Sequence, residues 1–187
     1  GCKSLTRVTL NDNLQSIGQS AFARSGLLAV CVPKGVTELL DGTFEECVAL
    51  KDLSFAADSA LARIDSRVFA KSGVTSLAAP SSLLDIGDEA FADCASLSAA
   101  TLPARLKTIG RGCFARTGLA QLAVPPAVAE LKDETFVDCA ALTSVEFADD
   151  SQLERIGVKT FAGSGLEAFV APAALRVLGY EAFRDCA

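Results

Sequence analysis

The sequence predicts an α/β solenoid of about eight stacked repeats of 22–25 residues, with parallel strands on one face and short helical or 3-10 turns on the other. Three observations lead to this prediction. Phenylalanine returns at a nearly constant interval, a short alternating apolar segment follows each phenylalanine, and a second apolar pair precedes the next one. A self-similar pattern of this length indicates a stacked repeat architecture. Residues 1–187 are therefore expected to form a single solenoid segment.

The phenylalanine column defines the repeat. Eight of the eleven Phe residues belong to it, at spacings of 22, 23 or 25 residues. One repeat cannot bury its apolar side alone, but stacked copies build a continuous core, in which these rings would form a spine. The members are Phe22, Phe44, Phe69, Phe91, Phe114, Phe136, Phe161 and Phe183.

The alternating apolar segment is the predicted strand. It begins about six residues after each phenylalanine, as in "LLAVCV" (27–32) and "LTSVEF" (142–147). Its fourth and sixth residues point the same way, as the period of two in a strand requires. Proline has no amide to donate to a ladder and so ends a strand. Five segments are followed by one, at Pro33, Pro80, Pro103, Pro125 and Pro172.

The second apolar pair and the phenylalanine complete the repeat. The pair has i, i+3 spacing, as in "LQSIG" (14–18) and "LKTIG" (106–110). The element that follows, for example "GDEAFADC" (87–94), is predicted to be a single helical or 3-10 turn. Acidic residues before the phenylalanine would complement the positive end of such a turn.

Two kinds of repeat alternate without exception. After the phenylalanine, one kind carries a cysteine, as in "FADC" (91–94), and the other a glycine, as in "FARSG" (22–26). A longer period of 92 residues is marked by the insertions "AADSAL" (56–61) and "ADDSQL" (148–153), which we interpret as polar corner loops. The chain begins and ends in the cysteine column, so we expect it to be a segment excised from a longer array.

The cysteine column predicts free thiols. In a solenoid its members would lie two strands apart, roughly 9.5–10 Å by the usual strand spacing. A disulfide needs Cα atoms within about 7 Å, and a tetrahedral zinc site needs Zn–S bonds of about 2.3 Å. The prediction is therefore a small buried thiol at Cys2, Cys47, Cys94, Cys139 and Cys186.

Composition excludes several classes of function. The 17 Lys and Arg residues are scattered in a chain of net charge −6, which argues against a nucleic-acid partner. No apolar run approaches the 18 or so residues of a membrane-spanning helix. The chain has no His, which removes Ser-His-Asp and Cys-His catalysis and histidine-ligated metals. We expect no cofactor and no metal.

The repeat pattern L-x-x-V-x-L-P-x-x-L-x-x-I-G-x-x-A-F-x-x-C closely resembles the BspA-type leucine-rich repeat over the whole chain. It is clearest in "LTRVTLNDNLQSIGQSAFARSG" (5–26) and "LSAATLPARLKTIGRGCFARTG" (97–118). The resemblance implies a right-handed α/β solenoid with parallel strands on its concave side. It also implies similarity to bacterial and protozoan proteins, secreted or at the cell surface, that bind host proteins, matrix or other cells. It supplies no catalytic residues. A right-handed parallel β-helix, whose coils can have similar lengths, is the alternative fold.

The outer surface of the predicted strands is the candidate binding face, because solenoids present an extended sheet to partners. The fifth residue of each strand segment faces outward, and polar neighbours surround this column. No Trp or Tyr lies in it to act as an anchor. The candidate residues are Arg7, Thr9, Cys31, Lys51, Asp52, Ser54, Thr101, Gln121, Thr143, Glu146 and Glu167.

The sequence favours a non-enzymatic protein-interaction or adhesion module of a surface or secreted protein, with a host or matrix protein as a possible class of partner. The alternative is a structural spacer, or stalk, in a larger surface protein in which another region does the binding. An enzyme is the third hypothesis. It would need a buried carboxylate or lysine with a perturbed pKa in a pocket, and no sequence feature indicates one.

Overall fold

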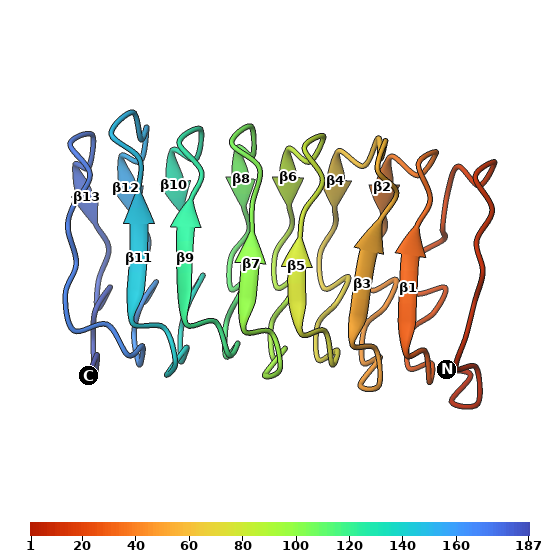
Figure 1. Cartoon of the computed structure of the whole chain (residues 1–187). Coiled ribbons are helices and arrows are strands. Elements are labelled where there is room, and N and C mark those ends of the chain that lie inside the picture. The colour runs from red at the N-terminus through yellow and green to blue at the C-terminus, as the bar shows by residue number, and fades with distance from the viewer.

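The structure, a computed structural model, describes all residues from 1 to 187. Successive turns of the chain stack side by side in a nearly straight row, with the two termini at opposite ends (Figure 1). All strand pairings are parallel. The predicted solenoid is thus confirmed as a parallel-strand β-solenoid of about seven turns.

The longer strands lie on one face, which we call the front face. Their burial alternates along the chain, because successive side chains in a strand point to opposite sides. They pair two by two, β1 with β3, β5 with β7 and β9 with β11. The front strands are β1 (Ala29–Val32), β3 (Asp52–Phe55), β5 (Ser76–Ala78), β7 (Ala99–Thr101), β9 (Gln121–Val124) and β11 (Ser144–Phe147).

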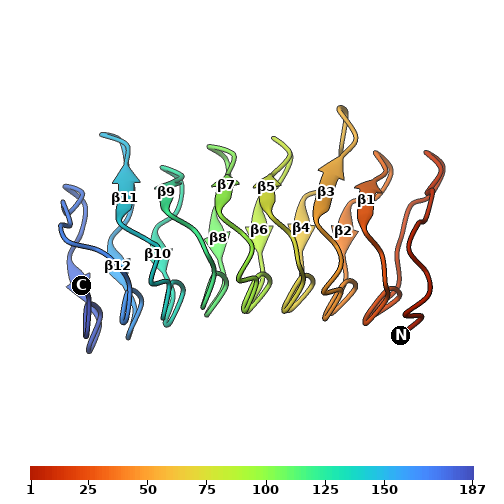
Figure 2. The same cartoon turned by 60° about the horizontal axis from the view of Figure 1, so that its bottom comes forward.

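The second apolar pair of each repeat forms the rear sheet, which the sequence analysis did not predict. Each of its strands has two residues, and the sheet is continuous in the order β13-β12-β10-β8-β6-β4-β2. Figure 2 shows these short strands behind the front strands. They are β2 (Glu38–Leu39), β4 (Arg63–Ile64), β6 (Asp85–Ile86), β8 (Thr108–Ile109), β10 (Glu130–Leu131), β12 (Arg155–Ile156) and β13 (Val177–Leu178).

The phenylalanine spine is confirmed. Consecutive rings of the column stack with centroids 5.1–5.7 Å apart and planes within 16° of parallel. The six rings from Phe44 to Phe161 are fully buried, whereas Phe22 and Phe183 at the two ends are half-buried. Inward residues of both sheets pack around the spine in one core cluster of 38 buried residues.

The helical or 3-10 turns were predicted wrongly, since the structure contains no helix. Around each phenylalanine, the residues two before and two after it have φ between +53° and +69°, as Arg67 and Lys71 do around Phe69. These left-handed residues interrupt any helix. They turn alternate amides toward the next turn of the chain: the amide of Phe44 donates to the carbonyl oxygen of Val68 at 2.8 Å, and that of Glu46 to Ala70 at 2.8 Å. The phenylalanine turns therefore form a third ladder of inter-turn hydrogen bonds.

The alternation of the two repeat kinds has a structural basis. We call the turns around Phe22, Phe69, Phe114 and Phe161 Gly-turns, and those around Phe44, Phe91, Phe136 and Phe183 Cys-turns. The thiol of each Cys-turn donates to the phenylalanine carbonyl of the preceding Gly-turn, as Cys94 does to Phe69 at 3.0 Å. The Sγ atom also lies 3.4 Å from the hydroxyl of Ser72 in that Gly-turn. The same contacts recur at Cys47, Cys139 and Cys186.

The front strands pair in the same two-turn units. A strand that follows a Gly-turn pairs with the strand that follows the next Cys-turn, as β5 pairs with β7. No strand pairing joins β3 to β5 or β7 to β9. The turn that lies between the strands of each break is a Gly-turn, around Phe69 between β3 and β5 and around Phe114 between β7 and β9. The front face is therefore a row of strand pairs, whereas the rear sheet is continuous.

Candidate functional site

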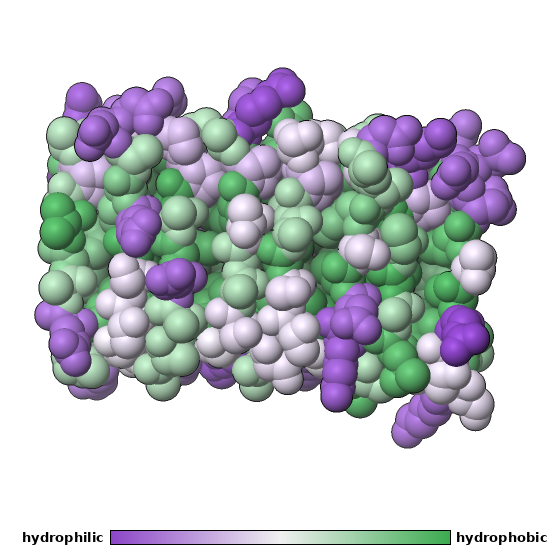
Figure 3. Space-filling view, in the orientation of Figure 1, coloured by the Kyte–Doolittle hydropathy of each residue, from purple (hydrophilic) through white to green (hydrophobic).

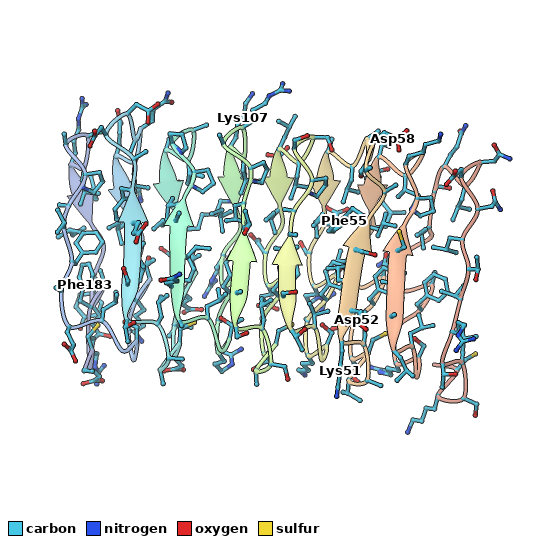
Figure 4. All side chains as sticks on the ribbon, viewed as in Figure 1. Lys51, Asp52, Phe55, Asp58, Lys107 and Phe183 are labelled. Carbon is cyan, nitrogen blue, oxygen red and sulfur yellow. The ribbon has the colours of Figure 1, made fainter.

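All eleven residues predicted for the binding face are exposed. Six lie on front strands: Cys31 on β1, Asp52 and Ser54 on β3, Thr101 on β7, Gln121 on β9 and Glu146 on β11. Lys51 and Thr143 immediately precede β3 and β11. The other three, Arg7, Thr9 and Glu167, lie in the first and last turns outside any strand. Figure 4 shows Lys51 and Asp52 at the start of β3.

Small residues dominate the rest of the front face. Between the charged positions, the outward side chains are Ala29, Ser76, Ala78, Ala99 and Ala123. The space-filling view shows this face as a largely white and pale green surface with a few separate hydrophilic patches (Figure 3). A partner would therefore meet mostly small side chains with few charged groups among them.

Most of the predicted site residues make no side-chain contact with one another. Thr143 donates its hydroxyl to the carbonyl oxygen of Ala120 at 3.3 Å, and Ser54 donates to Val30 at 3.4 Å, so these two help to hold neighbouring turns together. The carboxylates of Glu146 and Glu167 and the ammonium of Lys51 take part in no ion pair. The front face thus presents charges that nothing in the chain compensates.

Two hollows adjoin strand β11, and the sequence analysis missed both. The first, of about 660 Å³, lies between residues 143–149 and residues 168–173. The second, of about 320 Å³, lies on the other side of β11 and is lined by residues of the β7 and β9 turns. Glu146, Phe147 and Ala148 line both. The sequence signals that could have indicated them are Pro125, Pro126 and Pro172 after the strands and the "ADDS" insertion, whose Asp149 lines the first hollow.

A third hollow, of about 680 Å³, lies away from the front strands, at the phenylalanine turns. Lys3, Arg24 and Lys71 line it together with Glu46. The guanidinium of Arg24 donates to the Glu46 carboxylate at 2.9 Å, and this contact lowers the pKa of Glu46. The basic groups here are therefore partly engaged within the chain.

The buried cysteines are arranged as poor nucleophiles. Burial raises the pKa of Cys94 from 9.0 to about 11, in spite of the hydrogen bond from Ser72. Burial likewise raises the pKa of Cys113 and Cys139. Because the thiolate is the reactive form, these thiols are inert. All seven cysteines are free, as predicted. Cys47, Cys94 and Cys139 of the cysteine column are buried, but the prediction of a buried thiol is wrong at Cys2, which is exposed in the first turn, and Cys186 in the last turn is only partly buried.

The structure contains no group of three or more Cys, Asp or Glu side chains placed to hold a metal ion. The other shifted pKa values belong to arginines and carboxylates at the surface that pair with each other and to Tyr180, whose hydroxyl contacts Glu181. No helix long and apolar enough to cross a membrane occurs in the structure.

Comparison with known families agrees with the repeat geometry. The family model described as "BspA type Leucine rich repeat region" matches residues 1–78 and 62–187, in six copies. These two ranges together cover the whole chain. No curated protein matches the sequence.

Two solved structures share the fold. A leucine-rich repeat protein of T. pallidum has 28% sequence identity and a TM-score of 0.71, over 79% of this chain and 68% of its own. A leucine-rich repeat protein from Bacteroides ovatus ATCC 8483 has 22% identity and a TM-score of 0.67, over 100% of this chain and 66% of its own. The chain therefore spans about two thirds of the length of each.

Proposed function

We propose that this chain, which belongs to the BspA-type leucine-rich repeat family, is a non-enzymatic protein-interaction module whose front face binds a protein partner. Leucine-rich repeat domains generally serve as interaction modules, and this family is typically non-catalytic. One observation carries the proposal. Three charged side chains of the front face, Glu146, Glu167 and Lys51, are exposed and have no ion-pair partner, whereas charged residues of the phenylalanine turns such as Arg24 and Arg116 do have one. Exposed polar groups on an extended sheet are available to another protein.

The family membership also supports a place for the protein at the cell surface or outside the cell, and adhesion to a host or matrix protein as its role. Nothing in the chain favours a nucleic-acid partner, because its charge is −6 and its basic residues are scattered. The proposed partner is therefore a protein.

A structural spacer is the second candidate function. The nearly straight row of turns and the small side chains of the front face favour it (Figure 1). No Trp or Tyr lies on the front strands to supply the aromatic anchor that binding hot spots prefer. A stalk needs length and rigidity and does not need such an anchor.

A binding experiment separates the two functions. The chain is immobilised and exposed to a panel of extracellular-matrix and host-cell surface proteins, and binding is measured by surface plasmon resonance. Front-face variants Thr101→Arg, Gln121→Arg and Glu146→Arg should each weaken any interaction, whereas the rear-sheet variant Glu38→Arg should not. Binding that survives all three front-face changes would disprove the front-face assignment, and a chain that binds no member of the panel would favour the spacer.

A further inference from the structure

Strand β11 separates two hollows on the front face, and one acidic side chain borders both of them. Glu146 points outward from β11 and lines the larger hollow toward the last turn and the smaller one toward β9. A ligand that fills both hollows must therefore cross this carboxylate.

Apolar residues line part of each hollow. Pro172 and Val170 border the larger one, and Val170 is 82% exposed. Pro125 and Pro126 border the smaller one, together with Val124. These apolar surfaces can accept aliphatic side chains on both sides of Glu146, because burying apolar area is favourable.

The charge of the hollows is uncompensated. Their charged lining residues are Glu146 and Asp149, and no Lys or Arg lines either hollow. Neither carboxylate takes part in an ion pair. At the phenylalanine turns, in contrast, Asp93 and Glu134 both have an arginine partner.

The backbone leaves room for an extended ligand. No hydrogen bond joins β11 to residues 167–171, although β11 pairs along its whole length with β9 on its other side. The outer edge of β11 therefore faces the larger hollow without a strand partner. An extended peptide presents alternate side chains to one side, so residues i, i+2 and i+4 can face the same surface.

Resting on the proposed function, we infer that this part of the front face binds an extended segment of the partner protein in which a Lys or Arg lies between two apolar residues. The cation meets the carboxylate of Glu146, and the apolar side chains occupy the hollows on either side. The complementarity is electrostatic at the centre and apolar at the flanks.

The test uses an array of labelled heptapeptides of the form Ser-Φ-Ala-X-Ala-Φ-Ser, where Φ is Val, Leu or Phe and X is Lys, Arg, norleucine or Glu. Binding of each peptide to the whole chain is measured by fluorescence anisotropy at low ionic strength. Peptides with Lys or Arg at X should bind more tightly than those with norleucine, by up to about fivefold, as expected for one solvated ion pair. Replacing both Φ residues by Ser should also weaken binding.

Two variants decide whether the preference arises at β11. Glu146→Gln should abolish the preference for a cation at X, and Glu38→Gln is its matched control, because Glu38 is also exposed and without an ion pair but lies on the rear sheet. Both variants should keep the melting temperature. A preference that persists in Glu146→Gln, an equal affinity for Lys, norleucine and Glu, or no binding by any peptide would overturn the inference. The proposed function would still stand if front-face variants weakened binding of a whole protein partner, and it would fall if they did not.

Discussion

The phenylalanine turns and the front face repeat with the same period but differ in whether their charged side chains form ion pairs. At the turns, the charge two residues after the phenylalanine alternates in sign along the row, except at a glycine: Arg24, Glu46, Lys71, Asp93, Arg116, Asp138, Gly163 and Asp185. Two neighbouring pairs of this series form ion pairs, Arg24 with Glu46 at 2.9 Å and Arg116 with Asp93 at 3.0 Å. On the front face, Lys51, Glu146 and Glu167 take part in no ion pair, and many of the other outward side chains are alanine or serine. Ion pairs between turns thus occur at the phenylalanine turns and not at these front-face residues.

Charge repulsion between successive turns explains why two kinds of repeat alternate. Residues one turn apart are separated by about 4.8 Å, so like charges in successive turns would repel each other. Basic Gly-turns between acidic Cys-turns avoid this repulsion. The same alternation places Ser72 beside Cys94 and Thr117 beside Cys139. Both features involve side chains that meet only when turns stack.

The largest expected effect lies in the spine. Phe91→Ala should lower the free energy of unfolding by about 3–5 kcal/mol, because it removes a fully buried ring that stacks on two others. Thermal unfolding followed by circular dichroism measures this loss. The half-buried Phe22, which stacks on one ring only, is the matched control, and Phe22→Ala should cost clearly less. Melting within a degree or two of the unchanged protein would contradict a stabilising role for the stack.

The next effect depends on pH and on the buried thiols. The pKa of Cys94 is raised from 9.0 to about 11 in the folded chain, so the folded state keeps a proton that the unfolded state loses above pH 9. The contribution of this proton to the free energy of unfolding is fully present below pH 9 and is lost as the pH rises through 11. Its magnitude is up to about 3 kcal/mol for a pKa shift of two units. Urea unfolding at pH 8, 9, 10 and 11 measures it.

Cys94→Ser provides the comparison for the alkaline loss, because serine does not titrate in this range and can still donate to the carbonyl of Phe69. The variant should lose less stability than the unchanged chain between pH 9 and 11. An identical pH dependence would show that Cys94 stays protonated or titrates freely in both states.

The smallest effects concern surface charge. Arg116→Gln breaks the ion pair with Asp93, in which the side chain of Arg116 is 48% exposed and that of Asp93 is 34% exposed. Because the pair is solvated, its loss should destabilise the chain by less than about 1 kcal/mol. The loss should become smaller at high salt, which screens the pair. Thr101→Gln on the front face should change stability by less than about 0.5 kcal/mol. Chemical denaturation at low and high salt distinguishes the two. A salt-dependent loss at Thr101 as large as that at Arg116 would remove the contrast between the turns and the front face.

The repeating core was predictable from one sequence, because each of its features is local and recurs. The spacing of Phe91 and Phe114 predicts that they are neighbours in a stack, and the alternation in "LAQLAV" predicts that Leu122 is buried and Gln121 exposed. All residues of the predicted binding face are exposed for the same reason. Whether they bind a partner stays a prediction.

The turn conformation was not predictable from composition. The residues flanking Phe69, Arg67 and Lys71, are types that rarely adopt positive φ, which costs a non-glycine residue roughly 1–2 kcal/mol. Only the hydrogen bonds to the adjacent turn, such as that from the amide of Phe69 to Ala90 at 2.8 Å, offset this cost. Helix signals depend only on residues within the turn itself, so they do not reveal hydrogen bonds from the adjacent turn.

The sequence alone determined the period, the stacked architecture, the buried faces and the alternation of two repeat kinds, because these follow from which residues recur and at what interval. The tertiary structure decided the left-handed turns, the continuous rear sheet, the division of the front face into strand pairs and the two hollows beside Glu146. Each of these depends on how one turn is placed against the next. That placement is set by hydrogen bonds and packing between residues more than twenty positions apart, which no local pattern contains.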